Sequence, residues 1–456
     1  MHTPENPSSK LAYMTETPIP KLVSTLAVPT IISMLITSLY NMADTYFVGG
    51  LGYSAQAAVG IALPLMSVIQ AIGFTFGQGS GNTVSRLLGD NRNDEASQMV
   101  SVAFFSAFLM GAALAVLGTL FLKPMITALG ASPTSIGYTE DYVRYILIGA
   151  PFMISSLVLN NQLRFQGSAF YGMIGIASGA VINIGLDPLF IFVFHMGTGG
   201  AALATIISQF VGFCLLVGGT FRGGNLRLSL RNFKPSLERY RMVLAGGLPS
   251  FWRQALASVA VALLNLFAFN HGGDVAVAAM TIVSRITTFA NSTLMGFGQG
   301  FQPVCGFNYG AKLYGRVKEA FWFFFRVAAV GALLIAALGI LFAPQVVGIF
   351  QKDAEVVRIG TLAMRLQCAT FPLMAWFFPT SMTLQTIGRS FKASILAMSR
   401  QGLFFIPAIL ILPAFLGLLG VQMAQPVSDA FTFLISFPFG LNIAREFKSL
   451  SQSENK

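Results

Sequence analysis

The sequence predicts an all-α integral membrane protein with twelve transmembrane helices in two pseudo-symmetric six-helix lobes around a central cavity. Of its 456 residues, 54% are hydrophobic and only 10% are charged, which leaves too little polar surface for a soluble globule. Apolar stretches of about 20 residues recur along nearly the whole chain, without the ten-residue alternation of a membrane β-barrel. The two halves of the chain also repeat each other, which predicts two lobes of the same fold.

We predict twelve spans in two groups of six. The residues before 22 are polar and rich in proline and show no cleavable signal sequence, so we expect the first span to direct insertion. The spans are predicted at residues 22–46, 57–81, 97–121, 142–163, 170–194, 200–221, 243–269, 276–302, 318–342, 361–385, 391–414 and 420–443. They divide the chain into an N-terminal tail (1–21), an N-lobe (22–221), an inter-lobe loop (222–242), a C-lobe (243–444) and a C-terminal tail (445–456).

Basic residues predict the topology. The inter-lobe loop 222–242 carries six Lys and Arg residues against a single Glu, and most of the other Lys and Arg residues lie in the termini and the even-numbered loops. The positive-inside rule therefore predicts that both termini are cytoplasmic. The net charge of +11 is spread over these short loops and not over a soluble basic domain, which argues against nucleic acid as a partner.

An internal repeat relates the two halves at an offset of 221 residues. Gly77-Gln78-Gly79 falls on Gly298-Gln299-Gly300, and a further set of residues follows the same offset: Gly89 with Gly310, Leu163 with Leu384, and Gly167 with Gly388. Because six spans per repeat is an even number, both halves enter the membrane in the same orientation. This is the plan of transporters built from parallel repeats, with a cavity between the lobes that opens to either side in turn.

Two acidic residues lie well inside spans of the first half, where an ionised carboxylate costs about 2.5–3.5 kcal/mol. Asp44 has Tyr40 four residues before it, and Asp187 has Asn183 at the same spacing, so each pair shares a helix face. One hypothesis is a cation site in which the carboxylates bind a proton or a hard ion together with amide and hydroxyl oxygens. The alternative is two structural carboxylates that are hydrogen-bonded between helices.

Asp429 is the only acidic residue well inside a span of the second half. Arg285 and Arg400 are its candidate partners within the same repeat, so a structural ion pair and a role in transport both remain open. Arg253 and Arg326 lie close enough to predicted span ends for their side chains to snorkel to the membrane surface.

The sequence argues against an enzyme, and we assign no catalytic residue. The three histidines, His2, His195 and His271, lie in the N-terminal tail and in predicted outer loops, so neither a histidine triad nor a zinc site can form. A glycine-lysine loop for phosphate is also missing from the sequence, so ATP is not expected to drive the protein directly.

Several motifs together resemble the multidrug and toxic compound extrusion (MATE) family of secondary transporters. They are Ala27-Val28-Pro29, Asn41-Met42-Ala43-Asp44-Thr45-Tyr46-Phe47-Val48-Gly49, the doubled Gly-Gln-Gly, and Asn183-Ile184-Gly185-Leu186-Asp187-Pro188. The resemblance covers essentially the whole chain. It implies a V-shaped cavity between the lobes and export of cationic amphiphilic compounds against an inward flow of protons or sodium.

Within the family the chain looks most like the prokaryotic branch with a cation site in the N-lobe. That resemblance implies a proton or Na⁺ site formed by Asp44, Asn183, Asp187 and Thr205. It also implies that Tyr40, Tyr142 and Asn160 are neighbours of the site and that the first helix bends at Pro29. The chain departs from the branch with sodium ligands in the seventh and tenth helices, because spans 243–269 and 361–385 contain no Asp or Glu.

The resulting hypothesis is a secondary active multidrug antiporter of the prokaryotic inner membrane, working as a monomer and without a cofactor. Carboxylates with amide and hydroxyl partners suit both H⁺ and Na⁺, so the coupling ion stays open. The alternative is a flippase for a lipid-linked saccharide or a phospholipid, which would use the same architecture. A flippase cavity should be dominated by basic residues, whereas the embedded charges of the N-lobe are acidic.

Overall fold

The structure is a computed structural model that describes residues 7–49, 51, 53–222, 226 and 228–454, with side chains described except at 7–9, 41–46, 49, 53, 54, 56 and 454. Nearly all of the described chain is helical. The elements of the first half are α1 (Pro7–Glu16), α2 (Ile19–Gly49), α3 (Tyr53–Gly89), α4 (Asn93–Leu120), α5 (Leu122–Ala128), α6 (Ile136–Phe165), α7 (Ala169–Pro188), the π-helical turn η1 (Leu189–Val193) and α8 (Gly197–Thr220).

The second half repeats this plan after a short 3-10 turn in the inter-lobe loop. Its elements are η2 (Leu230–Asn232), α9 (Leu237–Gly310), α10 (Tyr314–Leu341), α11 (Ala343–Phe350), α12 (Ala354–Thr370), the 3-10 turn η3 (Phe371–Leu373), α13 (Met374–Thr386), α14 (Ser390–Met398), the π-helical turn η4 (Ser399–Phe404), α15 (Phe405–Leu416) and α16 (Leu418–Glu454).

Twelve membrane passes emerge from these elements. Within the described residues, ten helices are long and apolar enough to cross a membrane. One of them, α9, contains two passes, because Gly273 has φ 62° and ψ −159° and reverses the chain inside it. A further pass is formed by α12, η3 and α13 together, which the turn at Phe371–Leu373 divides into pieces too short to cross alone. The twelve-helix prediction is therefore confirmed.

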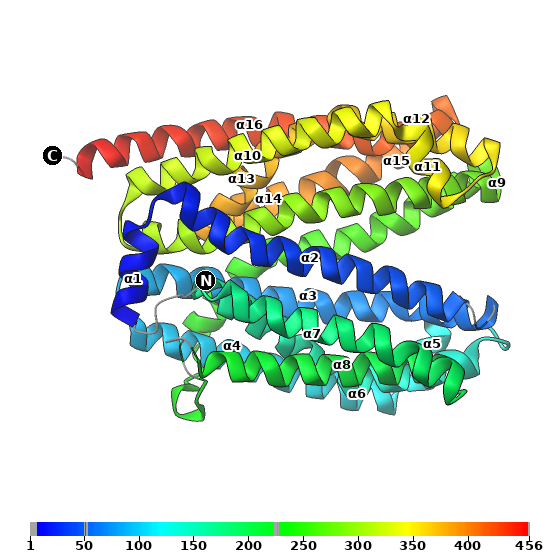
Figure 1. Cartoon of the computed structure of the whole chain (residues 1–456), viewed down its shortest axis with the longest axis horizontal. Helices are drawn as coiled ribbons and strands as arrows, with labels where there is room; N and C mark the ends of the chain where they lie inside the picture. The colour runs from blue at the N-terminus through cyan, green and yellow to red at the C-terminus, as the bar shows by residue number, and fades with distance from the viewer. Residues whose placement is uncertain (1–6, 50, 52, 223–225, 227, 455–456) are drawn as a thin grey trace.

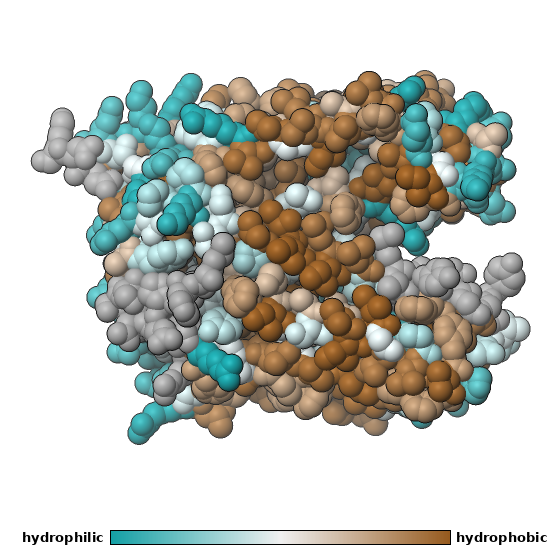
Figure 2. Space-filling model, in the orientation of Figure 1, coloured by the Kyte–Doolittle hydropathy of each residue, from teal (hydrophilic) through white to brown (hydrophobic). Residues whose placement is uncertain are grey.

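The passes form two layers that lie side by side (Figure 1). The N-lobe contains α2–α8 and the C-lobe contains α9–α16; of these helices, α2, α3 and α9 lie along the boundary between the lobes. Apolar side chains cover the middle of the molecule and hydrophilic ones gather at its two ends, as Figure 2 shows. The long direction of the helices is therefore the direction in which the protein crosses the bilayer.

The backbones of the two lobes approach each other closely where α3 crosses the second arm of α9. A methyl group added at Gly89 would collide with the Phe307 carbonyl oxygen, and one added at Gly310 would collide with the Arg86 carbonyl oxygen. These two contacts are related by the 221-residue offset, because Phe307 is the equivalent of Arg86 and Gly310 of Gly89. The crossing is thus self-complementary, like the interface of a two-fold symmetric dimer.

The repeat also gives two equivalent helices, α6 and α13, the same kind of C-terminal end. After α6, Gly167 has φ 78°, and the Ser168 amide donates to the Leu163 carbonyl oxygen at 2.9 Å. After α13, Gly388 has φ 85°, and the amide of the next residue donates to the Leu384 carbonyl oxygen at 2.9 Å. This is the Schellman ending, which requires a left-handed residue and favours glycine. It explains why leucine and glycine recur together at the shared offset.

The short helix α1 joins the two lobes at one end of the molecule. Lys10 Nζ donates to Ser168 Oγ of the N-lobe at 2.6 Å, and Asn308 Nδ2 of the C-lobe donates to the Met14 carbonyl oxygen at 3.1 Å. The C-terminal end of α16 lies at this same end (Figure 1). At the opposite end the molecule is hollowed between the lobes (Figure 2). The segment predicted as an N-terminal tail therefore contains a helix with a structural role.

Gly89→Ala and Gly310→Ala should each lower stability by about 1–3 kcal/mol, because the new methyl group would force two backbones apart. The two effects should be of similar size, since the sites are equivalent in the repeat. Thermal unfolding of the purified protein in detergent measures them. Gly60→Ala is the matched control, because nothing lies within 4 Å of a methyl group there. An equal loss of stability in all three variants would contradict this account of the crossing.

Docking of α1 should strengthen as the pH rises. Burial lowers the pKa of Lys10 from 10.5 to about 8, so the undocked lysine holds its proton up to about pH 10.5 and the docked one loses it at about pH 8. Docking therefore releases a proton between these values, and rising pH favours it. Protection factors of the α1 amides in hydrogen exchange measure the effect. Lys10→Met should remove the pH dependence, whereas Lys21→Met, at an exposed position, should retain it.

Candidate functional site

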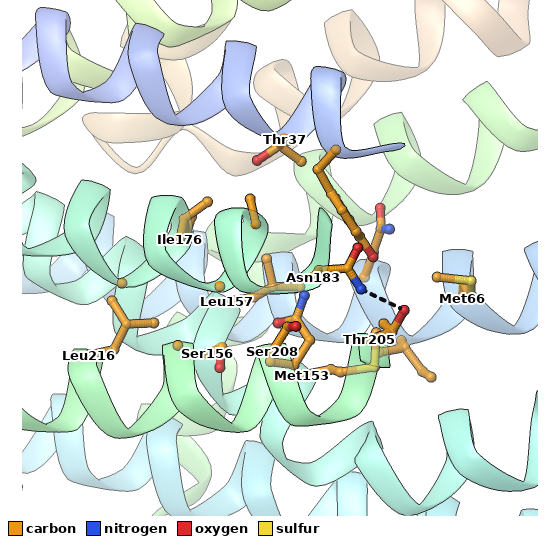
Figure 3. A pocket seen from close by; sticks show the side chains of 18 of the residues that line it. Thr37, Met66, Met153, Ser156, Leu157, Ile176, Asn183, Thr205, Ser208 and Leu216 are labelled. Carbon is orange, nitrogen blue, oxygen red and sulfur yellow. Dashed lines mark hydrogen bonds between the residues drawn. The ribbon is translucent and has the colours of Figure 1, made fainter. Parts of the chain in front are cut away.

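A cavity of about 170 Å³ lies inside the N-lobe, between α2, α3, α6, α7 and α8. Most of its wall is apolar, and its polar groups include the side chains of Asn183 and Thr205, which face each other across it (Figure 3). The lining residues are Thr37, Tyr40, Met66, Ile69, Gln70, Phe74, Met153, Ser156, Leu157, Gly175, Ile176, Gly179, Ala180, Asn183, Thr205, Ser208, Gln209, Gly212 and Leu216.

Asp187 lies directly beside this cavity and is fully buried. The Asn183 amide lies between Asp187 and Thr205, and it contacts both residues in either orientation of the amide. In one orientation Nδ2 lies 3.3 Å from Asp187 Oδ1 and 3.4 Å from Thr205 Oγ1. In the other, Nδ2 donates to Asp187 Oδ2 at 2.9 Å and the amide oxygen accepts from the Thr205 backbone N–H at 3.2 Å. These three side chains form one buried polar cluster.

Local sequence explains why the carboxylate is held at this position. Asn183 and Asp187 are one helical turn apart on α7, so their side chains share a face. Pro188 ends the regular α-helix, and the π-helical turn η1 follows it. Such turns are frequent at functional sites, since they change the direction of the following side chains. Asp187 is thus the last polar side chain on the inner face of α7 before the helix changes geometry.

The cluster offers oxygen ligands for a small cation. Within the part of the chain that the structure describes, no group of three His, Cys, Asp or Glu residues could hold a metal ion. A cation here would therefore be bound by Asp187 with the amide and hydroxyl oxygens of Asn183 and Thr205, a set suited to a hard ion. Protonation of Asp187 would equally remove the cost of an ionised carboxylate in the membrane interior.

Of the three residues predicted to neighbour the site, Tyr40 and Tyr142 lie at the cavity or against its wall, and Asn160 does not. Tyr40 lines the cavity, and the Tyr142 hydroxyl lies 3.9 Å from the sulfur of Met66, which also lines it. Asn160 instead donates to the Gly172 carbonyl oxygen at 3.0 Å and does not line the cavity. The side chain of Asp44 lies outside the described residues.

The helix that carries Tyr40 contains features that favour bending. Pro29 lies inside α2, where it lacks the backbone N–H of an ordinary helical residue. Hydroxyl groups bond the carbonyl oxygen four residues earlier on both sides of the proline, at Thr25, Thr30, Ser33, Thr37 and Ser38. Such bonds compete with the backbone ladder and often bend helices.

A second cavity, of about 330 Å³, lies in the C-lobe. In its wall, Arg400 Nε donates to Asp429 Oδ1 at 2.8 Å, and Gln425 Nε2 donates to the same oxygen at 2.7 Å. Arg400 lies in the π-helical turn η4 and Asp429 in α16. Of the two partners considered for Asp429, Arg400 is therefore the one that pairs with it, and Arg285 is exposed.

The two cavities adjoin at the boundary between the lobes. Gln254 Nε2, which lines the C-lobe cavity, donates to Gln70 Oε1 of the N-lobe cavity at 3.1 Å, and Ser258 donates to Ser67 one turn further along at 3.0 Å. Sequence reasoning missed these residues. Two glutamines inside apolar spans were the available signal, because polar side chains in membranes usually bond across helices.

Comparison with known proteins identifies relatives over nearly the whole chain. The family model described as MatE matches residues 29–189 and 249–411. The multidrug export protein MepA of Staphylococcus haemolyticus is 28% identical over 422 residues, which cover 92% of this chain and 93% of that protein. The model matches once in each lobe, at nearly the same offset as the internal repeat.

Solved structures show the same fold. A multidrug resistance MATE family transporter of the MOP superfamily in an outward-facing conformation superposes with a TM-score of 0.91 at 27% identity, covering 96% of this chain and 99% of that one. A MATE protein in a bent conformation superposes with a TM-score of 0.89 at 27% identity, covering 97% and 99%. The all-α fold with two lobes is therefore confirmed.

Breaking the Arg400–Asp429 pair from one side should be costly. Arg400→Met or Asp429→Leu alone leaves a buried charge without its partner and should cost about 3–5 kcal/mol, whereas the double variant should be close to neutral. Thermal unfolding of the four proteins gives the coupling energy. Arg358 and Glu355 are the matched control, since their side chains are 73% and 60% exposed and such pairs contribute about 1 kcal/mol or less. Additive losses in the double variant would contradict the expectation.

Proposed function

This chain belongs to the MatE family of membrane transporters, and we propose that it exports cationic amphiphilic compounds, drugs among them, in exchange for protons or sodium. Family membership makes it a transport protein and not an enzyme. A relative over 92% of its length is a multidrug export protein, which supports the same role here. The proposal goes further in assigning the charge of the substrate, the exchange with an ion and the residues involved.

One observation carries the proposal: a fully buried carboxylate, Asp187, stands beside a mostly apolar cavity with two neutral polar partners. An apolar wall suits the flat hydrophobic part of an amphiphile, and a carboxylate selects the positive charge. The same carboxylate is expensive to keep ionised without a cation. It is therefore suited to hold either the coupling ion or the charge of the substrate.

Exchange follows from competition for this group. In the proposal, an inward-moving ion binds Asp187 together with Asn183 and Thr205, and this binding removes the negative charge that held the substrate. Asp44, on the first membrane helix, is proposed as the second carboxylate of the same site. Since ion and substrate compete, each can drive the movement of the other without any direct contact between them.

Alternating access would use the two ends of the lobe boundary. The end that carries α1 is closed by the crossing of α3 and α9, whereas the opposite end is hollowed (Figure 2). We propose that binding of the ion bends α2 at Pro29. The bend would reduce the volume of the N-lobe cavity and so discharge the substrate. One solved relative that matches this chain is outward-facing and another has a bent conformation, and the proposal uses both kinds of state.

Topology and location complete the proposal. The described part of the inter-lobe loop, with η2, lies at the end closed by α1, as does the end of α16 (Figure 1). From the positive-inside rule we propose that this end is cytoplasmic. The hollow end then faces outward. We propose that the protein works as a monomer in a prokaryotic inner membrane.

Transport of rhodamine 123, a fluorescent cation, into vesicles tests the function. A pH gradient and a sodium gradient are applied separately, and the one that drives accumulation identifies the coupling ion. Asp187→Asn and Asp44→Asn should each reduce accumulation to that of protein-free vesicles with expression intact. Asp94→Asn, at an exposed position in the first turn of α4, is the control. Accumulation by a variant that lacks both Asp44 and Asp187 would refute the mechanism.

A further inference from the structure

We propose that the C-lobe cavity is a second binding subsite that accepts an anionic group of the substrate through the guanidinium of Arg253. The protein would then recognise zwitterionic amphiphiles as well as simple cations. This inference rests on the proposed export function and adds a substrate class to it.

Arg253 lies in the first pass of α9, ten residues inside the predicted span 243–269, or about 15 Å along the helix. Its side chain is partly buried and lines the C-lobe cavity.

The charge of Arg253 has no counter-charge in the described protein. Its Nη2 donates to Ser250 Oγ at 3.2 Å, and a hydroxyl group cannot neutralise a cation. In the part of the chain that the structure describes, no carboxylate oxygen lies within ion-pair distance of Arg253. Ionisable groups inside membranes normally pair or face a functional cavity, since they are costly to keep there.

The other charges of the same cavity cancel each other. Asp429 accepts from both Arg400 and Gln425 through Oδ1, and its Oδ2 lies 3.5 Å from Arg400 Nη2. This carboxylate is saturated by its own neighbours. With Arg400 and Asp429 paired, the charged side chains that line the cavity sum to one positive charge, that of Arg253.

A carboxylate on the substrate is the chemistry that fits this cation. A guanidinium presents a planar fork of donors that matches a carboxylate through two parallel hydrogen bonds. The C-lobe cavity adjoins the N-lobe cavity through the Gln254–Gln70 bond. We therefore assign the anionic end of such a substrate to Arg253 and its cationic end to the side of Asp187.

Two dyes that differ only at this group provide the test. Rhodamine 123 is a methyl ester with one positive charge, and rhodamine 110 is the corresponding free acid and a zwitterion. Fluorescence polarisation gives the Kd of each for the purified full chain in phosphatidylcholine nanodiscs. Arg253→Gln should raise the ratio of the acid Kd to the ester Kd by about tenfold, the loss expected for a charge-assisted hydrogen bond. Arg253→Lys, which keeps the charge, should raise the ratio less.

The controls separate the possible failures. Arg326→Gln, at an exposed position of α10, should leave the ratio at the wild-type value. An unchanged ratio in Arg253→Gln would overturn the subsite, even if export of rhodamine 123 is intact. A wild-type protein that binds neither dye would overturn the proposed function together with the subsite. Displacement of rhodamine 110 when phosphatidylglycerol is added to the nanodiscs would assign Arg253 to a lipid phosphate and refute the substrate role.

Discussion

The close crossing of α3 and the second arm of α9 is the constraint on which the rest of the structure depends. At Gly89 and Gly310 the backbones approach so closely that no Cβ fits between them, which brings two helices together without interlocking side chains. Because the two contacts are equivalent in the repeat, each lobe supplies the same surface to the other. Because the lobes are joined at one end, they can separate at the opposite end, and the two cavities lie along this separation.

The two lobes share one fold because of the internal repeat, but their polar and charged side chains differ. The positions equivalent to Asp44 and Asp187 in the C-lobe are Asn265 and Ala408, so the second lobe has lost both carboxylates or never had them. The cavity of the second lobe is lined instead by Arg253, Arg400 and Asp429, of which Arg400 and Asp429 pair. A bilayer makes each isolated charge expensive, which supports the binding roles proposed for Asp187 and Arg253.

Much of the fold could be predicted from the sequence, because the strongest sequence signals occur in both halves of the chain. The offset of 221 residues predicted two equivalent lobes, and the recurring leucine and glycine correspond to equivalent helix ends. The pairing of Asp187 with Asn183 was predictable from their spacing on one helix. Contacts between distant segments could not be predicted, since nothing in the sequence relates Gln70 to Gln254. The position of Arg253 on the wall of the C-lobe cavity could not be predicted either, because it depends on how the helices of that lobe pack around α9.

The closed end must also be able to open if the lobes are to alternate, and its composition makes this feasible. Separating backbones at a glycine crossing exposes little apolar surface, so the hydrophobic cost of separation is low. The links made by α1 include the Lys10–Ser168 bond and the bonds that the Met14 and Thr17 carbonyl oxygens accept, each worth about 1 kcal/mol net where water can replace it. They lie at the hydrophilic end of the molecule (Figure 2), where water is available. Opening this end would also break the apolar packing of the buried Met14 side chain, whereas the hydrogen bonds can be exchanged for bonds to water, as the proposed alternation of the lobes requires.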